Sequence, residues 1–205
     1  MEVMYCNDVL NNYFANKNIT GFIGEISDLE AIVSDIKVKP IKDSMKVKKI
    51  IKKNIDDFKL LGLSDDILSR KYRDLSYGEQ KLMRLIYTCA ERPSIVILND
   101  FDLGFTSKMK SKISRYIKTV NASFNINFII VTNDILFVNK NAKHIIISKG
   151  KIIKYQGDII TAIKQNLIAK PPIIEFIDMA NQKGADLEYT LDSKELLKAI
   201  YRSVF

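Results

Sequence analysis

Several residue types on which common active sites depend are scarce or missing in this chain of 205 residues, which has no tryptophan, one histidine and two cysteines. Cys6 and Cys89 do not have metal-ligand spacing, so we interpret them as reduced thiols and expect no metal site. No apolar run approaches the ~20 residues of a membrane-spanning helix, and the N-terminal residues lack the apolar core of a secretory signal. We therefore expect a cytoplasmic protein.

The composition that remains is typical of one folded domain, or of one domain with a small appendage. Hydrophobic residues make up 47% of the chain and charged residues 27%, and the net charge is +8. Nine lysines fall between Lys37 and Lys59. They could form a surface for phosphates, nucleic acid or anionic lipid, or the solvated face of a helix. We favour the solvated face, because the stretch lacks the interleaved aromatic residues on which bases of a single strand would stack.

The most informative stretch runs from Asp74 to Asp100. Ser76 and Glu79 have the spacing of a capping box, which predicts the start of a helix. Apolar residues then recur at helical spacing (Leu82, Leu85, Ile86, Cys89). Pro93 ends this helix, and residues 95–98 form a short β-branched run of the kind that is buried on both faces of a parallel sheet. Asn99 and Asp100 follow at the carboxyl end of this strand, where open α/β sheets place their binding residues.

Two segments of this stretch resemble motifs of a known family. LSYGEQ, which contains Ser76, Tyr77, Gly78, Glu79 and Gln80, resembles the LSGGQ signature of ABC-type ATPases, and RPSIVILNDFDLGF resembles their Walker B strand and D-loop. The order and spacing of the motifs also match. The resemblance implies an α/β fold, a truncated P-loop core of ABC-ATPase type with a mostly parallel sheet. The alternative is that LSYGEQ is simply a capped helix start.

The segment that would form the nucleotide loop departs from the family pattern. Residues 19–24 resemble the strand that enters the P-loop, G-x-x-x-x-G-K-[ST], in which backbone N–H groups and a lysine hold the phosphates. Counting on from Gly24, Leu29 takes the place of the second glycine, Glu30 that of the lysine and Ala31 that of the magnesium-binding hydroxyl. Carboxylates here would repel a triphosphate. We expect a degenerate loop, although residues 19–24 could also be an ordinary strand and turn.

The family's other catalytic positions are altered too. Asn99 falls where the family has the magnesium-organising aspartate, and Asp100 falls at the catalytic glutamate or, after a one-residue slip, at that aspartate. Asn133, after an apolar strand at residues 127–132, replaces the switch histidine. The single histidine, His144, lies in an expected β-hairpin that turns at residues 149–151, and we interpret it as structural. Asp100 is the one candidate left for catalysis.

The rest of the chain divides into a short middle and a helical tail. Between Gly24 and Ser76 there is room for about one helix, residues 47–61, ended by Gly62. The tail, residues 159–205, resembles the C-terminal extension of the energy-coupling factor (ECF) transporter ATPases. We expect a core over residues 1–158 and an extension over 159–205 that contacts other subunits.

The tail is expected to hold two helices. One starts at Pro171–Pro172 and ends at residues 183–184, and the last is capped by Asp192 or Ser193. Their expected apolar faces are Ile173, Phe176, Ile177 and Ala180 in the first helix, and Leu196, Leu197, Ile200 and Tyr201 in the second.

Together these resemblances imply a degenerate ATP-binding subunit of an ECF-like importer. In the family, two ABC domains pair head to tail, and each ATP, with Mg2+, lies between one P-loop and the opposite signature. This chain would bind no nucleotide alone, but its residues 76–80 would complete the site of an intact ABC ATPase. It would lie at the inner face of the membrane beside a transmembrane subunit. Alternatives are an enzyme that relies on Asp100, a purely regulatory module, and a soluble module that binds nucleic acid through residues 37–59.

Overall fold

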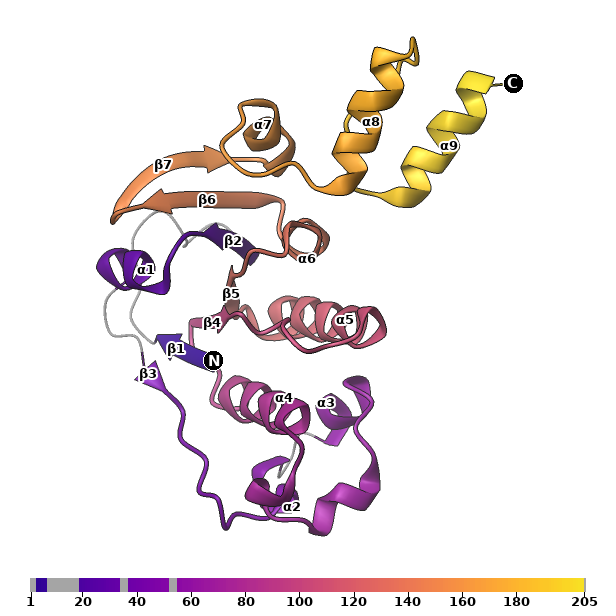
Figure 1. Cartoon of the computed structure of the whole chain (residues 1–205). Helices are drawn as coiled ribbons and strands as arrows, with labels where there is room; N and C mark the ends of the chain where they lie inside the picture. Colours follow the sequence, from indigo (N-terminus) through magenta and orange to yellow (C-terminus); the bar gives the residue numbers. More distant parts are fainter. Residues whose placement is uncertain (1–2, 7–18, 34–36, 52–54, 205) are drawn as a thin grey trace.

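The protein is an α/β domain built on one seven-stranded sheet (Figure 1). The structure, a computed structural model, describes residues 3–6, 19–33, 37–51 and 55–204. The strands lie in the order β3-β1-β4-β5-β2-β6-β7. Their bounds are Val3–Cys6 (β1), Ile19–Ile23 (β2), Lys37–Val38 (β3), Ile95–Asn99 (β4), Asn127–Val131 (β5), His144–Lys149 (β6) and Ile152–Gly157 (β7). The four central strands, β4, β5, β2 and β6, run parallel, and the strands at both edges pair antiparallel.

Helices cover both faces of this sheet, but unequally. On one face, α1 packs over a small cluster that includes Leu29, Phe22 and Ile97. The larger core lies on the other face, under α4, α5, α6 and α7. The helices are α1 (Ile26–Ile32), α2 (Val47–Ile51), α3 (Ile55–Leu60), α4 (Tyr77–Cys89), α5 (Ser107–Phe124), α6 (Ile135–Asn141), α7 (Ile159–Lys164), α8 (Pro172–Gln182) and α9 (Ser193–Val204). Because β4 is buried on both faces, its run of β-branched residues is the one that a central parallel strand requires.

The expected α/β fold with a mostly parallel sheet is confirmed. The capping box at Ser76 and Glu79 starts α4, and the strand expected at residues 95–98 is β4. The hairpin of β6 and β7 also forms. Gly150 and Lys151 both have positive φ, at 61° and 65°, which matches the left-handed pair of residues that a two-residue hairpin turn needs.

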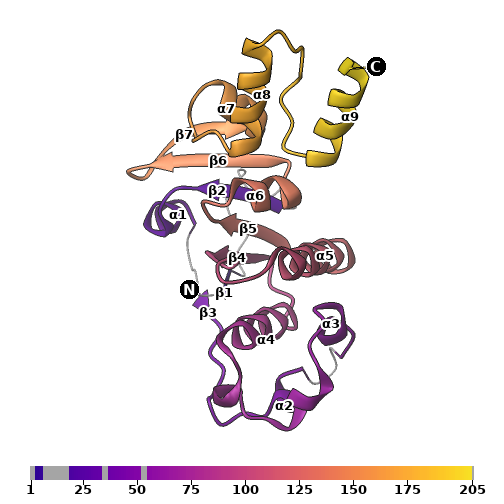
Figure 2. The same ribbon diagram turned by 45° about the vertical axis from the view of Figure 1, so that its right-hand side comes forward.

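The one helix expected over residues 47–61 is found as two helices, on either side of residues 52–54, which lie outside the described ranges. The described parts of this segment are α2 and α3, and they pack against different helices, α4 and α5 (Figure 2). Each short helix buries its own apolar residues, Val47, Ile50 and Ile51 in α2 and Phe58 in α3. Gly62, with φ of 69°, does end the segment as expected.

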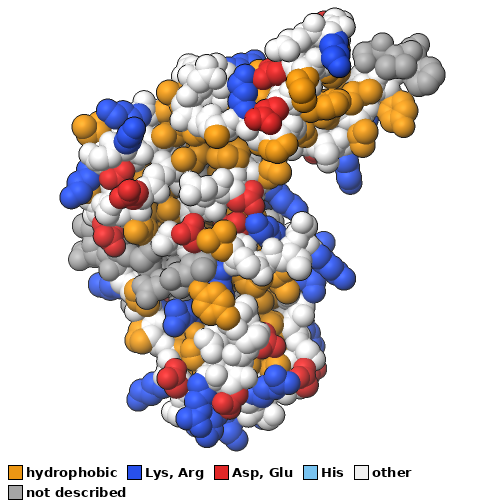
Figure 3. All heavy atoms as spheres, in the orientation of Figure 1, with side chains coloured by type: hydrophobic (Ala, Val, Ile, Leu, Met, Phe, Trp, Pro, Cys, Tyr) orange, Lys and Arg blue, Asp and Glu red, His pale blue; other side chains and the backbone are white. Residues whose placement is uncertain are grey.

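Three of the described lysines in and beside α2 point outward. Lys46, Lys48 and Lys49 are exposed while the apolar residues between them are buried. Lysine and arginine side chains gather at the end of the molecule that α2 forms, at the bottom of Figure 3, among acidic residues. Exposed lysines are compatible with the solvated helix face that we favoured and equally with a binding surface, so the choice between the two stays a prediction.

The two C-terminal helices form as expected, but the apolar face predicted for each helix includes residues that are exposed. In α8 the buried residues are Ile174 and Ile177, whereas Phe176 is 44% exposed. In α9 the Asp192 carboxylate caps the helix by accepting from the backbone N–H groups of residues 194 and 195. Leu197 and Tyr201 are 54% and 65% exposed, because α9 packs along one side only.

In the described part of the chain, no helix is long and apolar enough to span a bilayer.

Candidate functional site

The signature-like segment forms the first turn of α4. The Ser76 hydroxyl donates to Glu79 Oε2 (2.7 Å) and accepts from the Glu79 backbone N–H (3.3 Å). Glu79 Oε2 also accepts from the Ser76 backbone N–H (2.7 Å). The carboxylate of Glu79 therefore occupies the position at this helix N-terminus where an anion would bind. Any phosphate that reached Ser76 would have to displace it.

Of the neighbouring signature residues, Tyr77 is exposed, whereas Gly78 and Gln80 pack against or bond to other segments. Tyr77 is 59% exposed. A Cβ at Gly78 would lie 3.2 Å from a ring carbon of Phe105, so a larger residue would press on the loop after β4. The Gln80 amide donates to the carbonyls of Tyr72 and Leu75, both at 3.2 Å, and ties the approach segment to α4.

Lys81 of α4 holds the loop that follows β4. Asp100 is half-buried, with φ of 46°, and its backbone N–H donates to the Val131 carbonyl (2.8 Å). Lys81 Nζ donates to the carbonyls of Leu103 (2.9 Å) and Asp100 (3.5 Å). Burial lowers the pKa of Lys81, and the charges of Asp102 and Asp100 partly offset this effect. The loop that follows β4 is thus fixed to α4.

A second lysine binds two carboxylates at the same edge of the sheet. Lys110 Nζ lies 3.0 Å from Asp102 Oδ2 and 2.6 Å from Asp134 Oδ2. Burial opposes the charge of Lys110, but its hydrogen bonds to Asp134 and Asp102 outweigh burial and raise its pKa. Burial would likewise raise the pKa of Asp134, and the Lys110 hydrogen bond and the Phe137 backbone N–H lower it instead. Both carboxylates therefore share one cation of the same chain.

The end of β2 has no loop that could surround phosphates. Only Gly24 and Glu25 separate β2 from α1, and Glu25 is the N-cap residue. Glu30 and Ala31, at the expected lysine and hydroxyl positions, are exposed residues within α1. A P-loop of the G-x-x-x-x-G-K-[ST] type needs several loop N–H groups around the phosphates. The residues at the end of β2 therefore do not fit a bound triphosphate.

Asp28 fixes α1 in this position. It is 4% exposed, and its carboxylate accepts from the Lys151 backbone N–H (2.7 Å) and the Ser148 hydroxyl (3.1 Å). A Cβ at Gly24 would lie 2.9 Å from the Ser148 carbonyl oxygen, so the strand end and the hairpin approach each other closely. Part of the space where a nucleotide loop would lie is thus filled by the chain's own contacts.

The predicted site residues do not all come together. Asn133 is exposed and, with Gly24 and Glu25, lines a cavity of about 770 Å3 that the β6–β7 hairpin also lines. Asn99 ends β4. Among the described residues no cluster of histidine, cysteine and carboxylate side chains could hold a metal ion. His144 begins β6 and is half-buried. Burial raises the pKa of the Cys89 thiol to about 12, which disfavours the thiolate that a cysteine nucleophile needs.

Sequence reasoning missed four residues that organise this edge: Asp28, Lys81, Asp102 and Lys110. One signal was available, because Lys81 lies four residues before Leu85 and so shares the buried face of α4. A lysine on such a face needs polar partners. Lys110 and Asp102 gave no comparable signal, since the contacts of Lys110 with Asp102 and Asp134 depend on the tertiary fold.

The sheet order, the helix after the signature and the C-terminal hairpin together define the fold of an ABC ATPase domain. Solved structures with this fold include CbiO1 of Clostridium perfringens, part of the ABC transporter complex CbiONQ (TM-score 0.55, 14% identity, 80% of this chain and 91% of that chain). Another is a dimeric ATP-binding cassette bound to ADP and Pi (TM-score 0.55, 15% identity, 75% of this chain and 89% of that chain).

The sequence relatives are ATP-binding proteins of transporters. The energy-coupling factor transporter ATP-binding protein EcfA2 of Mycoplasmopsis synoviae is 26% identical over 175 residues, 82% of this chain and 56% of that protein. A putative ABC transporter ATP-binding protein of Methanosarcina acetivorans is 21% identical (84% and 54%), and EcfA2 of Streptococcus thermophilus is 22% identical (91% and 72%). The chain spans about half the length of the first two relatives. No protein-family model matches the sequence.

Proposed function

We propose that this chain is a degenerate ATP-binding-cassette subunit of an ECF-like importer, which pairs with an intact ATPase and completes its partner's ATP site. The observation that carries the proposal is the contrast between two motifs. The helix start at Ser76 keeps the signature's form, whereas β2 runs into α1 without a nucleotide loop. A chain of this kind can present a signature to a nucleotide held by another subunit, although it has no cradle for its own.

The physical basis is the N-terminus of α4, a helix of 13 residues. Its free N–H groups and dipole favour an anion, and the Ser76 hydroxyl can donate to a phosphate oxygen. Glu79 must first release Ser76, since it now bonds both the hydroxyl and the N–H. We therefore expect Glu79→Gln to ease the approach of a partner-bound phosphate by removing the competing charge.

The chain would supply contacts to the partner's ATP, and it would not activate the water that attacks the phosphate. Asp100 is the candidate base, but Asn99 precedes it where a metal-organising carboxylate belongs, and Lys81 holds the loop that follows. The exposed apolar residues of α8 and α9 suit contact with other subunits, and a transmembrane partner would place the protein at the inner face of the membrane.

The test is ATP turnover by the purified chain, alone and mixed with an intact ABC ATPase subunit of an ECF-type importer. We expect no ATP hydrolysis by the chain alone and ATP hydrolysis by the mixture. Ser76→Arg should abolish hydrolysis by the mixture, because the arginine side chain would block the signature. Ser123→Arg, at an exposed position near the end of α5, adds the same side chain elsewhere and should leave the mixture active.

Two results would contradict the proposal. Turnover by the chain alone that is lost in Asp100→Asn would mean that it is an enzyme with its own nucleotide site. Binding of DNA or RNA that weakens steeply with salt, without any effect on a partner ATPase, would favour the nucleic-acid module.

A further inference from the structure

A groove with a volume of about 480 Å3 lies where α5 meets α6. The two helices run side by side in both views of the fold (Figures 1 and 2). α5 supplies Ser111, Arg115, Lys118 and Thr119 to the lining, and α6 supplies Lys140. Among the described residues no acidic side chain lines this groove. It lies outside the candidate site, and none of these side chains takes part in the contacts described there.

The two lysines of the groove are fixed, because each crosses to the other helix. Lys118 Nζ donates to the Lys140 backbone carbonyl in the last turn of α6 (2.7 Å), and Lys140 Nζ donates to the Ser111 hydroxyl (2.7 Å). In these contacts each ammonium uses one of its three N–H donors. The groove therefore presents positive charges that are held in place and can still donate to a ligand.

The chain does not balance the charge of this groove. Arg115, Lys118 and Lys140 form no ion pair with any carboxylate in the described ranges. α5 itself has four lysines and one arginine among its 18 residues and no acidic residue. Like charges that are held close together raise the electrostatic energy of the fold, and a bound anion would lower it. The arrangement therefore indicates an anion site.

The donors of the groove suit a phosphate group. The planar guanidinium of Arg115 can donate two parallel hydrogen bonds to phosphate oxygens, and the Thr119 hydroxyl adds a neutral donor. Ser111, Arg115 and Lys118 follow each other at intervals of four and three residues, so they share one face of α5 over about 10 Å. We propose that this groove binds a compact phosphate group, as free phosphate or as a small phosphate monoester. The site does not depend on the proposed function.

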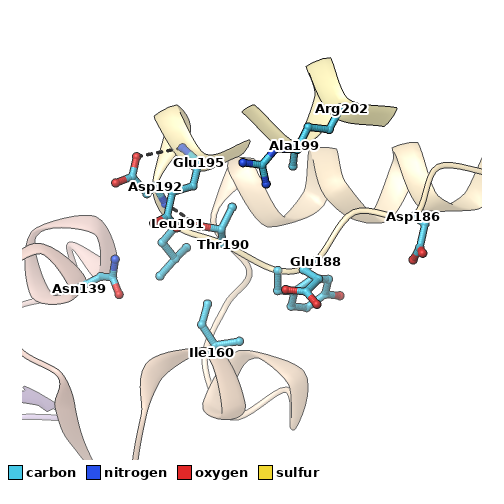
Figure 4. Close-up of a pocket in the computed structure, with 11 residues that line it drawn as sticks. Asn139, Ile160, Asp186, Glu188, Thr190, Leu191, Asp192, Glu195, Ala199 and Arg202 are labelled. Atoms are coloured by element: carbon cyan, nitrogen blue, oxygen red, sulfur yellow. Dashed lines mark hydrogen bonds between the residues drawn. The ribbon is translucent and has the colours of Figure 1, made fainter. Parts of the chain in front are cut away.

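Carboxylates on both flanks of the groove limit the size of this ligand. Asn139, next to Lys140 on α6, lines a second groove that lies against α9. Four carboxylates line that second groove (Figure 4): Asp186, Glu188, Asp192 and Glu195. On the other flank α5 packs against α3, which carries Asp56 and Asp57 (Figures 1 and 2). A nucleic acid or a lipid surface that spread over both flanks would meet these charges, whereas a compact anion would not.

The first experiment titrates the full chain with sodium phosphate and follows the backbone amide signals of α5 and α6 by NMR, with the ionic strength held constant by sodium chloride. Because the cations are exposed to solvent, we expect a Kd on the order of 1 mM. Sodium chloride alone should give no saturating change. An affinity of this order is too weak for calorimetry at micromolar protein, so the groove would not imitate a nucleotide site in an ATP titration.

Arg115 is the residue to vary, since its side chain forms no hydrogen bond or ion pair with the described residues and its loss leaves the contacts between α5 and α6 in place. Arg115→Gln should weaken phosphate binding about tenfold, and Arg115→Glu should abolish it. Arg115→Lys keeps the charge without the planar fork and should give an intermediate affinity.

The control variant is Lys183→Gln, which removes one positive charge at an exposed position beyond α8. It should bind phosphate like the parent chain. An equal loss in this control, phosphate-dependent changes spread over the whole surface, or unchanged binding by Arg115→Glu would overturn the inference.

The second experiment separates the possible sources of the phosphate. Glycerol phosphate, a small monoester, should bind within about threefold of free phosphate, because both present the same group to the same donors. Duplex RNA and vesicles that contain phosphatidylglycerol should bind the parent chain and Arg115→Glu alike. If either of them binds at micromolar concentration and loses this binding in Arg115→Glu, the groove is a nucleic-acid or lipid surface and the compact ligand is wrong. These measurements use the chain without a partner, so they hold whether or not it completes the site of another ATPase.

Discussion

Two segments at the same edge of the sheet have diverged in opposite ways. After β2, a helix begins within two residues, and the carboxylate of Asp28 holds it against the β6–β7 hairpin. Beside β4, the first turn of α4 keeps its capping box, and Lys81 ties it to the loop that follows the strand. The first segment has no loop that could surround a phosphate, and the second has a capped helix N-terminus.

The residues of the two segments also differ in what they do for the fold. The signature residues stabilise the chain that contains them, since Ser76 and Glu79 cap α4 and Gln80 bonds the approach segment. Their presence is therefore explained by folding alone, and only an assay with a partner can assign them a role toward ATP.

The largest effect on stability should come from Lys110, which neutralises carboxylates beside β4. Lys110→Met leaves the Asp102 carboxylate, 1% exposed, without its cation. We expect a loss of about 3 kcal/mol in the free energy of unfolding, as for other broken buried ion pairs. Urea unfolding measures it, and Lys108→Met, at an exposed position, should change stability by less than about 0.5 kcal/mol.

The pH dependence of this loss provides a second test. Because the pKa of Asp134 is lowered in the folded state, its contribution is present above about pH 3.8 and is lost as the pH falls through the folded pKa. Because the pKa of Lys110 is raised, its contribution is present below about pH 10.5 and is lost as the pH rises further. The gap between parent and variant should be flat between these limits. A gap that changes near neutral pH would show that other groups dominate.

The Asp28 contact at the end of β2 should have the next largest effect. Asp28→Ala leaves the Lys151 N–H and the Ser148 hydroxyl without this acceptor, and we expect a loss of about 2 kcal/mol in the free energy of unfolding. Glu30→Ala, two residues on and exposed, is the matched control and should be nearly neutral. If both variants were equally stable, Asp28 would not be what holds α1 against the hairpin.

The elements that the sequence predicted well were those with local signals. The capping box, the β-branched run of β4 and the glycine turn of the hairpin each depend on residues close in the chain. The separate packing of α2 and α3, the exposure of Phe176 and the pairing of Lys110 with Asp134 depend on which surface lies opposite, and periodicity alone does not contain that information. For the same reason, counting residues after Gly24 gave positions for a nucleotide loop but could not reveal that the helix begins at Ile26.

Removing the signature's cap should have a smaller effect. Ser76→Ala deletes the side-chain acceptor for the Glu79 N–H, which costs about 1 kcal/mol at a helix N-terminus. Thr106→Ala, which removes the cap of α5, should cost a similar amount, because Thr106 accepts from the Met109 N–H in the same way. A loss for Ser76 far above that for Thr106 would mean that the signature serves the fold beyond capping one helix.

The smallest effect is expected for restored P-loop residues in α1, and it tests directly whether the backbone after β2 excludes ATP. Substituting Glu30→Lys and Ala31→Ser together restores the lysine and hydroxyl of the P-loop pattern. If decay were a matter of side chains alone, these changes would bring back ATP binding. Both positions lie within α1, where no loop N–H groups surround a phosphate, so we expect no binding of ATP by calorimetry, as in the parent chain. Binding by the double variant would mean that α1 can unwind into a loop, and the segments after β2 and beside β4 would then differ in sequence rather than in backbone.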